Sequence, residues 1–179
     1  PRDPDSGLLV DASGFAFPCA PGQLDAALAL PVIEVAPDAE GAKPVVSGQR
    51  VQNPQYDRGM ALRATACAVS PDSAGWIDTI RQSREWAMEM TSREGLSATF
   101  GVGDQERQME DLVSIIDHAR VSGQPVASVN LIPRKHIPVR MKDDSAPRTV
   151  TVEDPEPAAA PQKTSSPSRR ESDLKQLLN

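Results

Sequence analysis

The chain has 179 residues, of which 39% are hydrophobic and only 3% are aromatic, and it contains 17 prolines, so part of its length is expected to remain unfolded. Its formal net charge of −6 and the lack of a basic stripe argue against a nucleic-acid-binding module and against docking onto an anionic membrane surface. No apolar run is long enough to span a bilayer and no signal-peptide pattern is present, so any membrane anchor is expected upstream of Pro1.

The N-terminal part of the chain predicts short β elements. Apolar residues 8–10 and 15–17 flank turn residues that end in Gly14, which is typical of a hairpin in which Gly14 has a positive φ angle. Residues 23–30 fit either a short helix or a loop. Residues 31–35 have the apolar, β-branched composition of a strand.

A helix is predicted next, because Asn53 is a favourable N-cap residue and Pro54 suits the first helical position. Residues 56–69 continue it, and the Ser-Pro pair at 70–71 ends it. Trp76, Ile77 and Ile80 then indicate part of a short strand.

The clearest β signal lies on both sides of a turn that ends at Gly95. Apolar side chains recur at every second position, and these are Trp86, Met88 and Met90 before the turn and Leu96, Ala98, Phe100 and Val102 after it. A period of two on both sides of a turn predicts a hairpin with one buried face.

A second helix is predicted from Asp104, which is expected to cap it, to Gly123, which suits a helix C-terminus. Apolar residues recur at helical spacing and form one stripe: Met109, Leu112, Val113, Ile116 and Ala119. Residues 126–132 and 137–141 alternate around a turn at 133–136 and predict a second hairpin. Because Pro138 cannot donate to a ladder, its strand is expected at a sheet edge.

The order of these elements predicts an α+β domain over residues 1–142, with a largely antiparallel sheet and two helices. Residues 143–179 are rich in Pro, Ala, Ser and charge and lack periodicity, so they predict a disordered tail. The end of the tail, residues 173–178, is slightly amphipathic and fits either a frayed terminus or a short partner-binding motif.

The chemistry of the chain offers no catalytic pattern. His118 is expected on a helix surface and His136 in a turn, and residues 101–103 lack the further glycine and lysine of a phosphate loop. Cys19 and Cys67 fit either two small buried hydrophobic residues or one disulfide. No cofactor, metal or small-molecule substrate is therefore expected.

Taken together, the order and spacing of several segments resemble the β-domain of the FtsQ/DivIB family of bacterial cell division proteins. The similar segments are residues 8–17 with 30–33, 95–101, 104–119, 129–131 and 137–140. Two departures stand out: Asn130 occupies a position where the family often has aspartate, and Pro138 lies within the last strand.

The resemblance implies a non-catalytic scaffold on the periplasmic face of the inner membrane at the division septum. Family members have a transmembrane anchor and a POTRA domain before this β-domain, bind coiled-coil partners of the FtsB and FtsL type, and link them to septal peptidoglycan synthesis. The partner adds to the last strand, so the resemblance and the basic turn imply these binding residues: Arg134, Lys135, His136, Ile137, Val139, Arg140 and Met141.

Three other interpretations remain open from the sequence. An unrelated envelope assembly module would share the binding role without the division partners. An enzyme with a dispersed site would need a deep polar pocket around His118 or His136. Pro138 and the neighbouring charges also fit a strand edge that is merely protected from aggregation.

Overall fold

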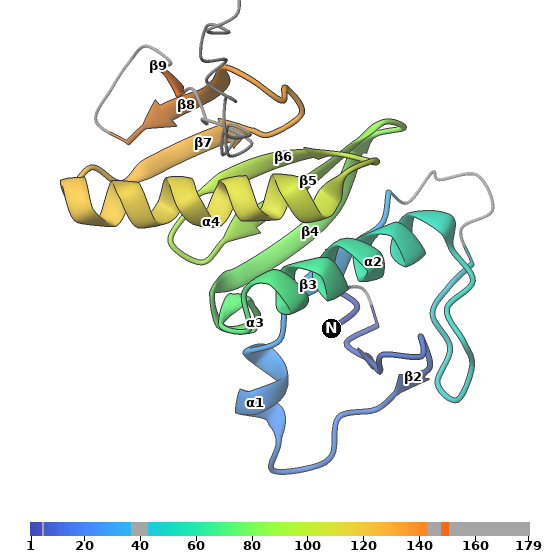
Figure 1. Cartoon of the computed structure of the whole chain (residues 1–179). Helices are drawn as coiled ribbons and strands as arrows, with labels where there is room; N and C mark the ends of the chain where they lie inside the picture. Colours follow the sequence, from blue (N-terminus) through green and yellow to red (C-terminus); the bar gives the residue numbers. More distant parts are fainter. Residues whose placement is uncertain (5, 37–42, 143–147, 151–179) are drawn as a thin grey trace, which may run out of the picture.

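The structure is a computed structural model that describes residues 1–4, 6–36, 43–142 and 148–150. The helices and strands follow one another along the chain as shown in Figure 1. They are β1 (Leu9–Val10), β2 (Ala16–Phe17), α1 (Leu24–Leu28), β3 (Val32–Glu34), α2 (Pro54–Val69), α3 (Ser73–Trp76), β4 (Ile77–Arg84), β5 (Ala87–Ser92), β6 (Ser97–Gly101), α4 (Gln105–Ser122), β7 (Val126–Asn130), β8 (Ile137–Met141) and β9 (Arg148–Val150).

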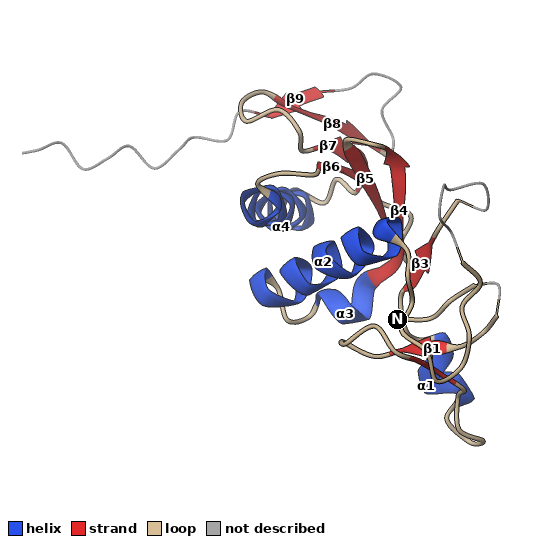
Figure 2. Cartoon of the chain, turned by 90° about the vertical axis from the view of Figure 1, so that its right-hand side faces the viewer, coloured by secondary structure: helices blue, strands red, loops and turns tan. Residues whose placement is uncertain are grey.

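The main sheet has seven strands in the order β3-β4-β5-β6-β7-β8-β9. Neighbouring strands are antiparallel except for the parallel pairs β3–β4 and β6–β7. The two long helices, α2 and α4, cover one face of this sheet, as Figures 1 and 2 both show. The predicted α+β fold with a largely antiparallel sheet is confirmed, and α1 and α3 add two short helices to the predicted long ones.

The core fills the space between the sheet and the two long helices. Its fully buried side chains include Leu62 of α2, Met109 and Leu112 of α4, and Met88 and Phe100 of the predicted hairpin. The predicted stripe on α4 is partly wrong, because Ile115 is buried while Val113 and Ile116 are only half-buried. The buried face of α4 is turned toward Gln108, Asp111 and Ile115, and two of these positions are polar, so apolar spacing alone did not locate it.

Local predictions near the N-terminus are confirmed. Strands β1 and β2 form the antiparallel hairpin, and Gly14 has a φ angle of 85°. The Asn53 side chain accepts hydrogen bonds from the backbone N–H groups of Gln55 and Tyr56, at 2.8 and 3.4 Å, and so caps α2. Residues 23–30 contain the short helix α1.

Three expectations about the strands and caps are corrected. Trp76 ends α3, and β4 extends through Arg84 because its pairing with β5 continues as far as Arg84 and Ala87. Trp86 is 54% exposed and lies against the Arg84 guanidinium instead of in the core. Asp104 has a left-handed backbone and its side chain caps no N–H of α4.

The cysteines and the predicted start of the tail also differ from expectation. Cys19 and Cys67 are free and each is partly exposed, so neither a disulfide nor a buried pair is present. The predicted tail lies outside the described residues at 143–147 and 151–179, which include the amphipathic motif at 173–178. Residues Arg148–Val150 form β9, so the predicted boundary after residue 142 leaves out one strand of the sheet.

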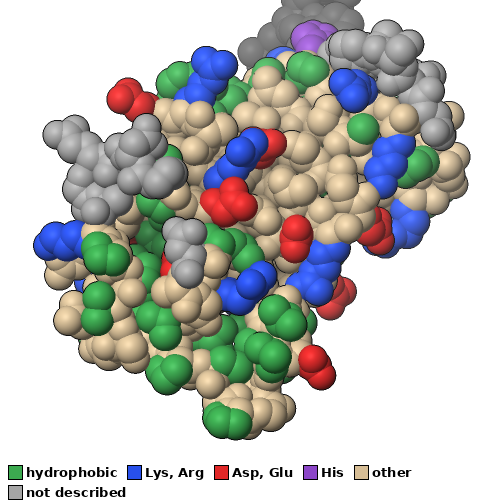
Figure 3. Space-filling view, turned by 180° about the vertical axis from the view of Figure 1, so that it is seen from behind, with side chains coloured by type: hydrophobic (Ala, Val, Ile, Leu, Met, Phe, Trp, Pro, Cys, Tyr) green, Lys and Arg blue, Asp and Glu red, His purple; other side chains and the backbone are tan. Residues whose placement is uncertain are grey.

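The face of the molecule away from α2 and α4 is mixed in character. Figure 3 shows charged side chains of both signs on it, while hydrophobic side chains gather at the level of β1, β2 and α1. The large exposed hydrophobic residues of that N-terminal part are Phe15, Phe17, Leu24, Leu28 and Val46.

A cross-strand ion pair between β4 and β5 is extended to β6 by a hydrogen bond. The Arg81 guanidinium of β4 donates two hydrogen bonds to Glu89 of β5, at 2.7 and 3.0 Å, and the Ser97 hydroxyl of β6 donates to the other carboxylate oxygen at 2.9 Å. Burial acts to raise the pKa of Glu89, but the hydrogen bonds from Ser97 and Arg81 and the Arg81 charge outweigh it. The pKa of Glu89 is therefore held below its ordinary value of 4.5.

Glu89→Gln is expected to remove a pH-dependent part of the stability. A carboxyl group whose pKa is lowered by folding stabilises the folded state above its unfolded pKa, and that contribution is lost as the pH falls through the folded pKa. The stability difference between wild type and Glu89→Gln should be largest above the ordinary glutamate pKa of 4.5 and shrink as the pH falls below it. Urea denaturation across this range measures it, and a difference independent of pH would contradict the assignment.

Candidate partner-binding surface at the β8 end of the sheet

Strand β8 reaches the sheet through an antiparallel hairpin with β7. The register pairs Val126 with Met141, Ser128 with Arg140 and Val129 with Val139, with an irregularity between the first two pairs. Strand β7 in turn pairs in parallel with β6, so β8 extends the sheet beyond the predicted central hairpin.

The side chains of β8 are divided between the core and the solvent. Ile137 and Val139 are fully buried, and Pro138 and Met141 are half-buried. Arg140 is exposed. Among the predicted binding residues of β8, Ile137 and Val139 can therefore offer a partner their backbone groups but not their side chains.

The prediction that β8 is the edge strand is wrong. Strand β9 pairs with it antiparallel, matching Ile137 with Val150, Pro138 with Thr149 and Val139 with Arg148. Three residues are too few for a period-two pattern to be visible, so no periodicity predicts β9. The register of β9 stops at Val139 and does not include Arg140 or Met141.

The β7–β8 turn carries the other predicted binding residues. Arg134, Lys135 and His136 are all exposed, and His136 has a positive φ angle of 56°. Arg134 forms an ion pair with Asp104 at 3.1 Å, so its charge is partly engaged within the chain. Because its side chain is 78% exposed, this pair is expected to contribute less than about 1 kcal/mol to stability.

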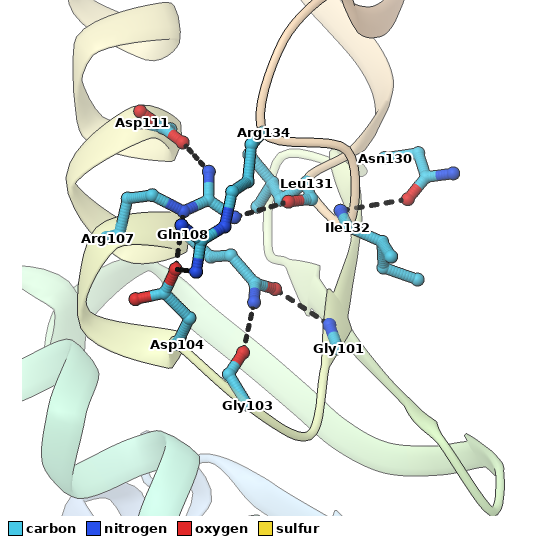
Figure 4. Close-up of polar contacts among 10 residues, drawn as sticks. All are labelled: Gly101, Gly103, Asp104, Arg107, Gln108, Asp111, Asn130, Leu131, Ile132 and Arg134. Atoms are coloured by element: carbon cyan, nitrogen blue, oxygen red, sulfur yellow. Dashed lines mark hydrogen bonds and ion pairs between the residues drawn. The ribbon is translucent and has the colours of Figure 1, made fainter. Parts of the chain in front are cut away.

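A polar network at the start of α4 supports this turn, and Figure 4 shows its members. The Arg107 guanidinium donates to Asp104 at 3.0 Å, to the buried Asp111, and to the backbone carbonyl of Leu131 at 3.2 Å. Leu131 lies directly after β7, so one arginine ties the helix to the connection between β7 and β8.

The amide of Gln108 supports the neighbouring loop. Its oxygen accepts a hydrogen bond from the N–H of Gly101 at 2.7 Å, and its nitrogen donates to the carbonyl of Gly103. Gln108 is 2% exposed, so these bonds are shielded from water. Asn130 accepts from the N–H of Ile132 at 3.2 Å and turns the chain after β7.

Sequence reasoning missed these supporting residues. The spacing Asp104, Arg107, Asp111 is the acid–base spacing of neighbouring side chains on a helix, which was the available signal. Side chains at this spacing more often lie in solvent. Here Arg107 also makes a tertiary contact, because the carbonyl of Leu131 lies within hydrogen-bond distance of it.

The described residues contain no group of three or more His, Cys, Asp or Glu side chains that could hold a metal ion. A hollow of about 420 Å³ lies near the C-terminal end of α4 and is lined by Trp76, Leu96, Ile116 and Lys142 among others. Neither His118 nor His136 lines it, so the pocket expected for an enzyme with a dispersed site is not formed there.

Comparison with known proteins finds no family model that matches the chain and no match among curated proteins. In the part of the chain that the structure describes, no helix combines the length and the apolar character needed to cross a membrane.

Proposed function

We propose that this chain is a non-catalytic scaffold of the bacterial division machinery, of the FtsQ/DivIB kind. It would act on the periplasmic face of the inner membrane at the septum, held there by an anchor upstream of Pro1. Its partners would be coiled-coil proteins of the FtsB and FtsL type. The proposal starts from the resemblance of the ordered segments between residues 8 and 141.

The observation that carries the proposal is how the sheet ends. Beyond the central strands, β7 and β8 form a hairpin supported from behind by Arg107, and the only strand beyond β8 among the described residues is the three-residue β9. A well-supported sheet with such a short terminal strand is suited to pairing with an extended segment of another protein.

Exposed positive charges also support a binding role for the β7–β8 hairpin. Lys135 and Arg140 are exposed and neither forms an ion pair with a described residue. Exposed charges at the rim of an interface raise association rates and select partners of opposite sign. An acidic segment beside the partner's extended strand would therefore fit this surface.

The proposal is tested by measuring binding of the whole chain to the periplasmic segments of the host's FtsB-like and FtsL-like proteins. The double variant Lys135→Glu/Arg140→Glu should bind at least about tenfold more weakly and with a reduced salt dependence. The variant Lys43→Glu/Arg58→Glu makes the same charge change at exposed positions outside the β7–β8 hairpin and is the matched control.

Val139→Asp is not a usable variant, because Val139 is fully buried and a charge there would disrupt the core. If both double variants and the wild type fold, as circular dichroism would show, and none binds the division partners, the division scaffold is wrong. The unrelated envelope assembly module would then be the better interpretation.

A further inference from the structure

Strand β9 is attached to the sheet by few bonds. It occupies the end of the strand order, so β8 is its one neighbour among the described strands. Its register covers Ile137, Pro138 and Val139, and no described residue pairs with the last two residues of β8 on that side.

The missing N–H of Pro138 shows which backbone groups hold β9. In an antiparallel pair, residues alternate between those that exchange hydrogen bonds and those that do not. Because Pro138 cannot donate, the pairs that exchange bonds are Ile137 with Val150 and Val139 with Arg148. The nitrogen of Pro138 therefore faces β7, and no hydrogen bond to β9 is lost through the proline.

The same alternation describes what β9 leaves uncovered. Met141 follows Ile137 and Val139 at the same parity, so its N–H and C=O also point toward the β9 side, beyond the end of the β9 register. A longer strand in this place would cover more of β8 than β9 does.

We propose that β9 is an internal occupant of the β8 edge, and that a partner's extended segment displaces it and pairs antiparallel with β8 from Ile137 through Met141. The identity of that partner rests on the function proposed above, whereas the occupancy and displacement of β9 do not. Acidic residues flank β9 in the sequence, at Asp143, Asp144, Glu153 and Asp154, and Arg140 of β8 is exposed. The partner segment would carry similar acidic residues beside its strand.

If a partner segment must displace β9, its apparent affinity for β8 depends on how stably β9 pairs with β8. A competitor in the same chain lowers the fraction of molecules with a free edge, and the apparent dissociation constant rises by the reciprocal of that fraction. Weakening β9 without touching β8 should therefore strengthen binding of an added strand.

The test uses the full chain and a fluorescent peptide that copies residues 143–155. Val150→Pro removes an N–H that bonds β8, and Thr149→Pro removes one that faces away from β8, so it is the matched control. The peptide should bind Val150→Pro at least about tenfold more tightly than it binds wild type or Thr149→Pro. Equal binding to all three chains, or binding to none, would overturn the proposal.

Binding of the FtsB-like and FtsL-like segments to the same three chains distinguishes failure of this inference from failure of the proposed function. If the FtsB-like and FtsL-like segments also bind Val150→Pro about tenfold more tightly than wild type, both stand. If the peptide distinguishes the variants but the division segments bind none of them, β9 remains the internal occupant and the division scaffold fails. If those segments bind all three chains equally, displacement of β9 is wrong and the division scaffold stands.

Discussion

Arg107→Met is expected to lower the free energy of unfolding by about 3 kcal/mol, because it leaves the charge of Asp111 buried without its partner. Asp111 is 8% exposed, and its ion pair with Arg107 lies against the chain that follows β7. The substitution also removes the hydrogen bond to the carbonyl of Leu131. Urea denaturation of the full chain measures the loss.

A matched control separates burial from charge. Arg120 forms a similar helical ion pair with Asp117, but both side chains are more than half exposed, so Arg120→Met should change stability by less than about 0.5 kcal/mol. In the double variant Arg107→Met/Asp111→Leu, part of the stability should return, since no buried charge remains. Equal effects of Arg107→Met and Arg120→Met would show that the network contributes nothing beyond a surface pair.

The loss of stability in Arg107→Met should also affect the proposed binding surface. Arg107 joins α4 to Leu131, which begins the connection to β8. In Arg107→Met, amide hydrogens of residues 131–136 should exchange faster, while those of β4 and β5 should keep their relative protection.

Gly59→Ala is expected to destabilise the fold by about 2 kcal/mol, although alanine is the better helix former by about 1 kcal/mol. A Cβ atom at Gly59 would lie 2.7 Å from Cγ2 of Ile33, and Ile33 is 1% exposed, so its side chain has little room to move. The contact lets α2 approach β3 closely. Thermal and urea denaturation measure the change.

Two further variants test the cause. Gly75 lies in α3 with open space where a Cβ would be, so Gly75→Ala should be neutral or slightly stabilising. In an Ile33→Ala background the clashing atom is absent, and Gly59→Ala should then cost nothing more. A cost that persists in that background would rule out the contact with Ile33 as the reason.

The candidate surface was predictable only in part. Lys135 and Arg140 are exposed, as a basic binding rim requires, because they follow turn and alternation patterns that local sequence reveals. The burial of Ile137 and Val139 follows from the same alternation. The cover that β9 provides was not predictable, since a strand of three residues is too short to leave a periodic pattern in the sequence.

The sequence by itself determined the elements whose signals are local: the Gly14 hairpin, the Asn53 cap, the hairpin around Gly95 and the Gly123 helix end. These depend on φ angles, cap hydrogen bonds and periodicity within a few residues.

Only the tertiary structure decided the parallel pairs β3–β4 and β6–β7, the buried polar face of α4 and the place of β9. Each brings together segments that are distant in the chain, and the free energy of such contacts depends on what each segment packs against. Asp104 illustrates the difference: it was expected to cap α4, but it pairs with Arg107 and Arg134 because the β7–β8 turn folds back beside it.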